Sequence, residues 1–130
     1  MIILDASALL EVLLRTPAAA AVERRLFDSR QTLHAPHLLD VEVAQVVRRY
    51  AAAGEVDADR GREALTDLVD FPLRRYPHDF LVPRVWEFRN NLTAYDAVYI
   101  ALAEALGAPL LTRDRRLAAA SGHQAQVELV

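Results

Sequence analysis

The sequence predicts an α/β fold: a single domain in which a mostly parallel, short-stranded central sheet is flanked by helices. The chain has 130 residues, 53% of them hydrophobic, which is the common size of one domain and enough apolar material for a core. Short apolar runs alternate along it with longer segments whose apolar residues recur at helical spacing. This alternation is typical of a parallel sheet covered by helices on both faces. We therefore treat residues 1–130 as one domain.

The first half of the chain predicts two strands and four helices. In chain order they are a strand at Met1–Leu4, helices at Ala6–Leu14 and Pro17–Phe27, a strand at Thr32–Ala35, and helices at His37–Ala53 and Asp57–Phe71. Pro17 and Pro36 are natural first residues of helices, and Gly54 is a natural helix end. In the last helix of this half, Leu65, Leu68 and Val69 are expected to face the core.

The second half predicts three strands and three helices. In chain order they are a strand at Pro72–Tyr76, helices at Phe80–Asn90 and Thr93–Leu106, a strand at Pro109–Thr112, a helix at Asp114–Ala120 and a strand at Gln126–Val130. Pro83 is tolerated in the first turn of its helix, and Gly107 closes the next one. The helix before Gly107 is apolar nearly all round, which indicates that the sheet and its neighbours bury it.

Composition excludes several classes of function. All 15 basic residues are Arg, so the Lys of a Walker loop, a receiver domain or a haloacid-dehalogenase-type phosphatase is missing. The absence of Cys excludes disulfides, thiolate nucleophiles and Cys-ligated metals, and it fits a reducing cytoplasm. The opening MIILDASALLEVLL is too short and too charged for a signal peptide or a membrane span.

Acidic residues follow two of the predicted strands. Asp5 comes directly after the first strand, and Asp114 comes two residues after the strand at Pro109–Thr112. Ligands of open α/β sheets bind beyond the carboxyl ends of the strands, so both acids are candidates for a site. The alternative role for each is an N-cap of the helix that follows.

Two further acids lie on predicted helices. Asp96 follows Thr93 by three residues, which fits a capping box, but its apolar helix also predicts a cleft-lining position where a charge needs compensation. On the helix at His37–Ala53, both Asp40 and Glu42 fall at the edges of the apolar face, which centres on Leu39, Val43, Val46 and Tyr50. Periodicity does not choose between these two acids.

A divalent cation would explain the acids jointly. Carboxylates brought together from strand ends and helix starts repel one another unless a cation lies among them. Oxygen ligands without His or Cys favour Mg²⁺ or Mn²⁺, and such ions assist the hydrolysis of phosphodiesters. Arg113 and Arg115 flank this region, and guanidinium groups match phosphate oxygens, so both are candidate phosphate contacts.

Four segments together resemble the PIN-domain ribonucleases, above all the VapC-type toxins of bacterial toxin–antitoxin pairs. They are IILDASAL at 2–9, APHLLDVEV at 35–43, LTAYDAVYIALA at 92–103 and LTRDRRL at 111–117. The third and fourth segments in this order are the specific ones. The resemblance covers essentially the whole chain.

This resemblance implies an Mg²⁺- or Mn²⁺-dependent endoribonuclease that cleaves RNA with metal-activated water. The catalytic, metal-binding acids would be Asp5, Glu42, Asp96 and Asp114. Ser7, Thr93 and Thr112 would orient carboxylates or water. The resemblance also implies a homodimer and an antitoxin partner whose tail lies as a helix in an apolar groove between the early helices.

The first helix supports a partner surface independently, because its leucines and Val12 extend around nearly the whole circumference. Two other classes of function stay open at this point. One is a PIN-fold interaction module in which the acids are only caps. The other is a nuclease acting on DNA, or a phosphatase, that uses the same metal site.

Overall fold

The five strands form one parallel sheet, as the sequence predicted. The structure, a computed structural model, describes residues 1–28 and 30–130. The strands are β1 (Ile2–Leu4), β2 (Leu33–Pro36), β3 (Leu73–Tyr76), β4 (Leu110–Thr112) and β5 (Val127–Leu129). Their order across the sheet is β3-β2-β1-β4-β5, and every neighbouring pair is parallel. The residues that follow β1 and β4 therefore lie side by side at the carboxyl edge of the sheet.

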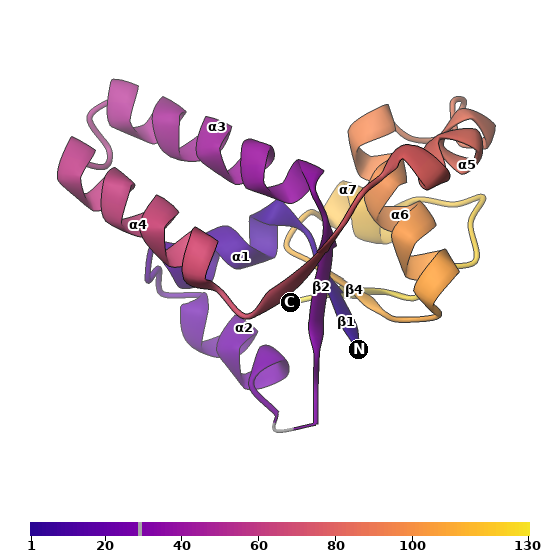
Figure 1. The fold of residues 1–130 in the computed structure, drawn as a ribbon, viewed down its shortest axis with the longest axis horizontal. Helices are drawn as coiled ribbons and strands as arrows, with labels where there is room; N and C mark the ends of the chain where they lie inside the picture. The colour runs from indigo at the N-terminus through magenta and orange to yellow at the C-terminus, as the bar shows by residue number, and fades with distance from the viewer. Residues whose placement is uncertain (29) are drawn as a thin grey trace.

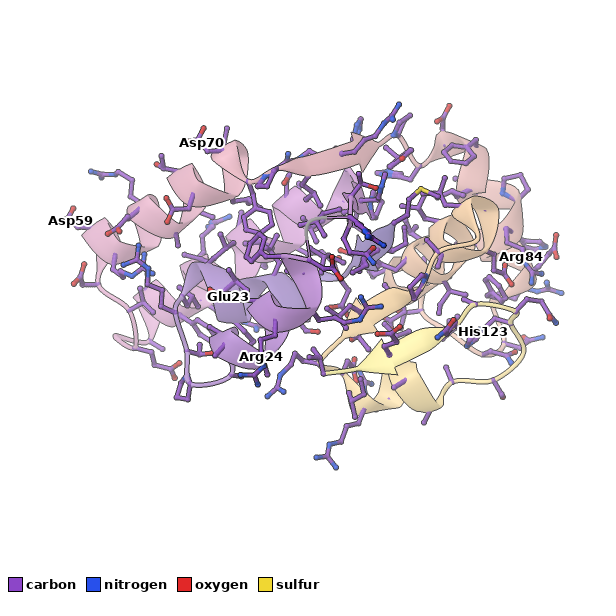
Figure 2. The ribbon with its side chains drawn as sticks, turned by 90° about the horizontal axis from the view of Figure 1, so that it is seen from below. Glu23, Arg24, Asp59, Asp70, Arg84 and His123 are labelled. Atoms are coloured by element: carbon purple, nitrogen blue, oxygen red, sulfur yellow. The ribbon has the colours of Figure 1, made fainter. Side chains whose placement is uncertain are left out.

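Helices cover both faces of this sheet. They are α1 (Ala6–Leu13), α2 (Ala19–Leu26), α3 (Leu38–Ala52), α4 (Ala58–Asp70), α5 (Val82–Glu87), α6 (Ala94–Leu106) and α7 (Arg115–Ala119), with a 3₁₀ turn η1 at Asp79–Leu81. Figure 1 shows the sheet nearly edge on, with α1 to α4 on one side and α5 to α7 on the other. Figure 2 shows charged side chains at both ends of the molecule, Asp59 and Asp70 on α4 at one end and Arg84 and His123 at the other.

The core lies against the two central strands. Ile2, Ile3 and Leu4 of β1 are buried, as are Leu110 and Leu111 of β4. On α6, seven consecutive residues from 97 to 103 are buried, which confirms that this helix packs on all sides. The burial of a helix around its whole circumference explains why its sequence shows no polar face.

Side chains and glycines at the helix ends explain where four helices begin and two end. Asp5, Asp57, Thr93 and Asp114 are the N-caps of α1, α4, α6 and α7, and each accepts a hydrogen bond from a backbone N–H of the first turn. Gly54 and Gly107 follow α3 and α6 with φ angles of 76° and 60°, in the left-handed region that glycine adopts without strain. The predicted helix ends at these glycines are confirmed.

Two predicted helix starts at prolines are wrong. Pro36 is the last residue of β2 and pairs with Tyr76 of β3, so α3 begins two residues later, at Leu38. The missing N–H of Pro36 is tolerated there because the strand ends at this residue. Pro17 also precedes its helix, since α2 begins at Ala19.

Two other details differ from the prediction. The helix expected at Phe80–Asn90 is divided into η1 and α5, and α5 ends at Glu87. On α4 the inward face consists of Gly61, Ala64 and Leu68, whereas Val69 is 75% exposed. Gly61 lets α4 approach α3 closely, because a Cβ atom at this position would lie 3.2 Å from Cγ1 of Val47. The buried face of α4 therefore includes small residues, while the large apolar Val69 points away from the core.

Among residues 1–28 and 30–130, no helix combines the length and the apolar character that crossing a membrane requires.

Candidate active site

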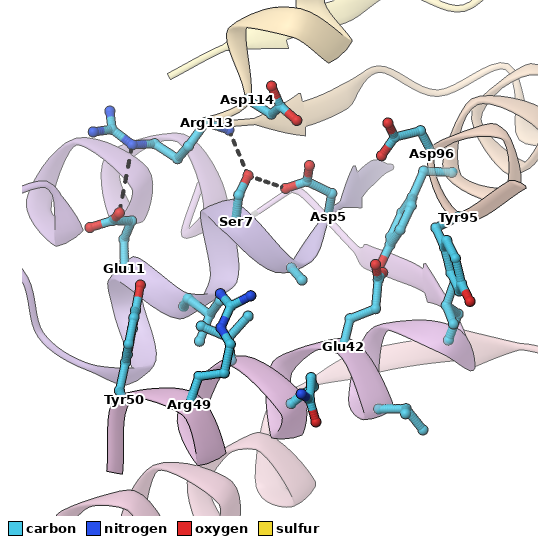
Figure 3. Close-up of a pocket in the computed structure, with 17 residues that line it drawn as sticks. Asp5, Ser7, Glu11, Glu42, Arg49, Tyr50, Tyr95, Asp96, Arg113 and Asp114 are labelled. Atoms are coloured by element: carbon cyan, nitrogen blue, oxygen red, sulfur yellow. Dashed lines mark hydrogen bonds and ion pairs between the residues drawn. The ribbon is translucent and has the colours of Figure 1, made fainter. Parts of the chain in front are cut away.

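A pocket of about 620 Å³ lies at the carboxyl edge of the sheet, between α1, α3 and α6. All four predicted acids, Asp5, Glu42, Asp96 and Asp114, line it (Figure 3). They come from four different elements: the end of β1, the second turn of α3, the first turn of α6 and the turn before α7. The parallel sheet thus brings together side chains that are up to 109 positions apart in the chain.

Asp5 is the most deeply buried of the four acids, with 6% of its surface exposed. Its Oδ1 caps α1 by accepting from the N–H of Ala8 at 3.2 Å, and it also accepts from the Ser7 hydroxyl at 2.6 Å. Its Oδ2 accepts from the hydroxyl of Thr112 at 2.6 Å. Asp5 is therefore both an N-cap and a pocket residue, so the two roles weighed from the sequence coexist.

The hydroxyls of Ser7 and Thr112 lie against each other and so form a hydroxyl bridge between the first turn of α1 and the end of β4. Their oxygens lie 3.3 Å apart, and each also accepts a backbone N–H, Ser7 from Arg113 and Thr112 from Asp114. Thr112 is fully buried. The bridge fixes the turn after β4 against the turn after β1, so it sets the separation of Asp5 and Asp114.

Asp114 and Asp96 enter the pocket from helix N-termini. Asp114 caps α7 by accepting from the N–H of Arg116 at 2.9 Å. Asp96 lies in the first turn of α6, where its own N–H donates to the hydroxyl of Thr93 at 3.2 Å. Helix N-termini favour negative charge, so these positions lower the cost of placing two carboxylates in one pocket.

The structure also separates the two acids of α3. Asp40 forms an ion pair with Arg75 of β3, at 2.8 Å between Nε and Oδ2. Glu42 instead lines the pocket, and its Oε1 accepts a hydrogen bond from the phenol of Tyr99 at 2.5 Å. The periodicity of α3 left this choice open, whereas the partners from β3 and α6 decide it in favour of Glu42.

Burial makes the ionised forms of three of these acids unfavourable. It raises the pKa of Asp5, and the nearby charge of Asp114 raises it further, although hydrogen bonds from Ser7, Thr112 and Ala8 oppose the increase. The pKa of Glu42 rises through burial and the charges of Asp5 and Asp96. Burial also raises the pKa of Asp96, and the charge of Asp114 adds to the shift. Carboxylates that raise one another's pKa in a shared pocket form an electrostatic site for a cation.

The donor set fits a hard divalent cation in its chemistry. All four groups are carboxylates, the ligand type that Mg²⁺ and Mn²⁺ prefer, and they share one pocket. They do not close into a coordination sphere here: in the part of the chain that the structure describes, no three His, Asp or Glu side chains are grouped tightly enough to hold an ion. Asp5, Glu42, Asp96 and Asp114 are the residues that would hold such an ion.

The remaining predicted site residues separate into two groups. Ser7 and Thr112 contact Asp5 directly, as described above, and Arg113 lines the pocket while pairing with Glu11 at 3.9 Å. Thr93 is an exposed N-cap that does not itself line the pocket, but its hydroxyl accepts from the N–H of Asp96 and also hydrogen-bonds the Asp96 carboxylate. Arg115 is exposed and does not line the pocket.

Sequence reasoning missed two residues of the pocket, Tyr99 and Arg49. Tyr99 is buried in the core, and its phenol also contacts Glu42. Arg49 projects into the pocket from α3, seven residues after Glu42 and so two turns along the same helix face (Figure 3). That i, i+7 spacing is visible in the sequence and is the signal that would have identified Arg49.

Two further aromatic side chains lie at the surface. Trp86 is 67% exposed and its ring lies under the guanidinium of Arg89, whereas Tyr95 is 62% exposed and lines the pocket. Both lie on short or terminal helical turns, where periodicity indicates little about direction. The guanidinium of Arg75 is engaged in the ion pair with Asp40.

Comparison with known proteins shows to which family the chain belongs. The model of the PIN domain family matches residues 2–122. The chain is 43% identical over 130 residues to Ribonuclease VapC12 of Mycobacterium tuberculosis, covering all of this chain and 99% of that protein. The chain therefore belongs to the PIN domain family and, within it, to the VapC ribonucleases.

Solved structures show the same fold. The crystal structure of PAE2754 from Pyrobaculum aerophilum matches with a TM-score of 0.69 at 29% identity, over 97% of this chain and 81% of that one. VapBC2 from Rickettsia felis, solved with a DNA fragment from its promoter, matches with a TM-score of 0.74 at 14% identity, over 100% and 99% of the two chains. The second likeness concerns the fold alone.

Proposed function

We propose that residues 1–130 form one nuclease domain, a divalent-metal-dependent endoribonuclease that acts as the toxin of a toxin–antitoxin pair. The observation that carries this proposal is the convergence of Asp5, Glu42, Asp96 and Asp114 on one pocket at the carboxyl edge of the sheet. The full-length relatedness to proteins named ribonuclease supports RNA as the substrate, because a carboxylate metal site does not by itself specify ribose.

Asp5, Glu42, Asp96 and Asp114 would hold Mg²⁺ or Mn²⁺. When bound, such an ion supplies Lewis-acid chemistry: it lowers the pKa of water and offsets charge on the phosphate. The protein supplies the positioning. Asp5 is fixed by three hydrogen bonds and by its burial, so it acts as the rigid member of the set. The Ser7 and Thr112 hydroxyls hold its two oxygens in place and so define the direction in which the free lone pairs point.

Arg49 and Arg113 are the phosphate contacts that the pocket offers. Both line it, and Arg113 holds its guanidinium beside Glu11 at the pocket wall. Among residues 1–28 and 30–130, no side-chain hydrogen bond or ion pair engages the exposed guanidinium of Arg49, so its five donors are available to a phosphodiester. Arg115, exposed beyond the pocket rim, would contact the backbone of a longer RNA further from the cleavage position.

Cleavage of RNA tests this function. Purified protein is incubated with total RNA with and without Mg²⁺ or Mn²⁺, and single-stranded DNA of matched length serves as a second substrate. We expect metal-dependent RNA cleavage that the Asp5→Ala variant lacks. Cleavage of DNA alone would favour the other nuclease class. Failure to cleave either substrate, with a folded protein and both metals present, would favour the non-catalytic interaction module.

The pocket also supports an antitoxin partner. Away from the acids it continues between α1 and α3 as an apolar groove lined by Leu10, Val46 and Tyr50. An amphipathic helix fits a groove of this kind, and an Arg or Lys of the partner would pair with the metal-binding acids. Structures with this fold include a VapBC2 assembly from Rickettsia felis and a toxin–antitoxin complex from Klebsiella pneumoniae.

Growth and size measurements test the partner and the expected homodimer. We place the protein in the cytoplasm, where RNA and a co-expressed antitoxin are accessible. Overproduction should arrest growth, and co-expression of the neighbouring short reading frame should restore it. Light scattering on the purified protein should give the mass of a dimer. Harmless overproduction of an intact protein would contradict the toxin assignment, and a strict monomer would contradict the dimer.

A further inference from the structure

We propose that Tyr99 is a positioning residue for the metal site, which holds Glu42 in the pocket by donating a hydrogen bond to one of its carboxylate oxygens. The phenol oxygen lies 2.5 Å from Oε1 of Glu42. Tyr99 is 2% exposed, and it belongs to the core cluster that α6 forms with the sheet. A buried ring has little freedom, so the position of its hydroxyl is set by the core rather than by solvent.

The geometry of α6 links this contact to the rest of the site. Asp96 and Tyr99 are three residues apart and so project from the same face of the helix. One helix face therefore supplies one acid of the pocket directly and fixes a second acid that belongs to α3.

The chemistry of the hydrogen bond suits a positioning role. The phenol has one proton to donate, and its oxygen lies within hydrogen-bond distance of Oε1 of Glu42. Donation to Oε1 leaves Oε2 of Glu42 available to a ligand. Without the phenol, the half-buried Glu42 would be free to rotate about its side-chain torsions, and ordering it would oppose ion binding.

This inference rests on the proposed metal site, and it is tested by ion binding in the absence of RNA. The Tyr99→Phe variant removes only the hydroxyl. Tyr76→Phe is a matched control, because its phenol also forms a 2.7 Å hydrogen bond, to Nδ1 of His34, but Tyr76 does not line the pocket. We expect Tyr99→Phe to weaken Mn²⁺ binding by roughly tenfold, the lower end of the effect of losing a group that orients a metal ligand, and Tyr76→Phe to leave it unchanged.

A double-mutant cycle shows whether the effect passes through Glu42. In a Glu42→Ala background the phenol has no side chain to hold, so adding Tyr99→Phe should change Mn²⁺ affinity by less than about twofold. The dissociation constants come from isothermal titration calorimetry at fixed pH. The cleavage rate at saturating Mn²⁺ should recover much of the loss that Tyr99→Phe causes at limiting Mn²⁺, because the variant weakens binding and keeps every acid.

The outcomes separate this inference from the metal site itself. Wild-type protein that binds no Mn²⁺ overturns both. Wild-type binding that Tyr99→Phe leaves unchanged overturns the role of Tyr99 alone. An equal loss of affinity from Tyr99→Phe in the wild-type and Glu42→Ala backgrounds would also overturn it, since Tyr99 would then act through core packing. Comparable losses of Mn²⁺ affinity from Tyr99→Phe and Tyr76→Phe would also overturn the role of Tyr99, because the control phenol does not line the pocket.

Discussion

Asp5 shows how a single carboxylate serves structure and function together. It caps α1, closes the hydroxyl bridge to β4 and projects into the pocket, all within a site where burial raises its pKa. We therefore expect Asp5→Ala to lower stability as well as activity. A cleaner test of the site uses an acid that carries fewer structural contacts.

Asp96 is such an acid, because only its backbone N–H participates in capping α6. We expect Asp96→Asn to lower the RNA cleavage rate by at least about 100-fold, since the amide keeps the shape of the side chain but removes the negative charge. Circular dichroism should show an unchanged fold. Asp70→Asn, at the exposed end of α4 (Figure 2), is the control. Near wild-type cleavage by Asp96→Asn would remove Asp96 from the metal site.

Glu42 and Asp40, the two acids of α3, provide a second prediction. Replacing each by its amide should have opposite effects on RNA cleavage and on the free energy of unfolding. Glu42→Gln should abolish cleavage and leave the free energy of unfolding unchanged or higher, because the charged form of Glu42 is unfavourable in the folded pocket. Asp40→Asn should leave cleavage intact and lower the free energy of unfolding by about 1 kcal/mol, since it weakens the ion pair with Arg75. Urea denaturation and RNA cleavage measure both effects. The reverse pattern would show that Asp40 is the functional acid.

Local sequence pattern nominates three of the acids, whereas Glu42 was chosen over Asp40 only through the resemblance to the PIN-domain ribonucleases. Asp5 and Asp114 follow strands, and Asp96 interrupts an apolar helix, so local pattern identifies them. Asp40 and Glu42 lie at the two edges of one apolar stripe, and their roles depend on Arg75 and Tyr99, which belong to other elements. Helical periodicity contains no information about those tertiary partners.

Helix caps and glycines made most elements predictable. The N-caps of α1, α4, α6 and α7 and the glycines after α3 and α6 act within a few residues, so the local sequence determines them. Pro36 shows the limit of such rules. Its ring suits a helix start, yet pairing with β3 keeps it in a strand, because the partner strand lies 40 positions further along the chain.

The close approach of α4 to α3 at Gly61 predicts how a larger side chain at that position changes stability. Gly61→Leu should lower the free energy of unfolding by about 1 to 3 kcal/mol, because a side chain at this position overlaps Val47. Adding Val47→Ala makes room for it, so the double variant should lose less stability than the two single changes added together. Urea denaturation of all four proteins measures the difference. Strict additivity would show that the two helices are not in limiting contact at Gly61.

The whole molecule carries an electrostatic cost in its pocket that a cation would offset. We expect millimolar Mg²⁺ or Mn²⁺ to raise the melting temperature near neutral pH, since the ion binds the folded protein and neutralises carboxylates that repel one another. Differential scanning fluorimetry measures the shift. The Asp96→Asn variant should show a smaller shift than the wild-type protein, and an unchanged melting temperature in the folded wild type would count against the site.

The pH dependence of this effect has a definite sign. The pKa values of Asp5, Glu42 and Asp96 are higher in the folded protein than their ordinary values of 3.8, 4.5 and 3.8, so folding takes up protons. The metal-free protein should therefore gain stability from these groups as the pH falls from neutral toward about 5. The stabilisation by metal should shrink over the same range, because protons and the ion compete for the same oxygens.

The pairing of β1 with β4 places Asp5 against Thr112, across 107 positions of sequence. During synthesis, the first acid of the site emerges from the ribosome long before the strand and turn that orient it. The site is therefore assembled late, because a chain that stops before Thr112 lacks both the hydroxyl that orients Asp5 and the acid at position 114.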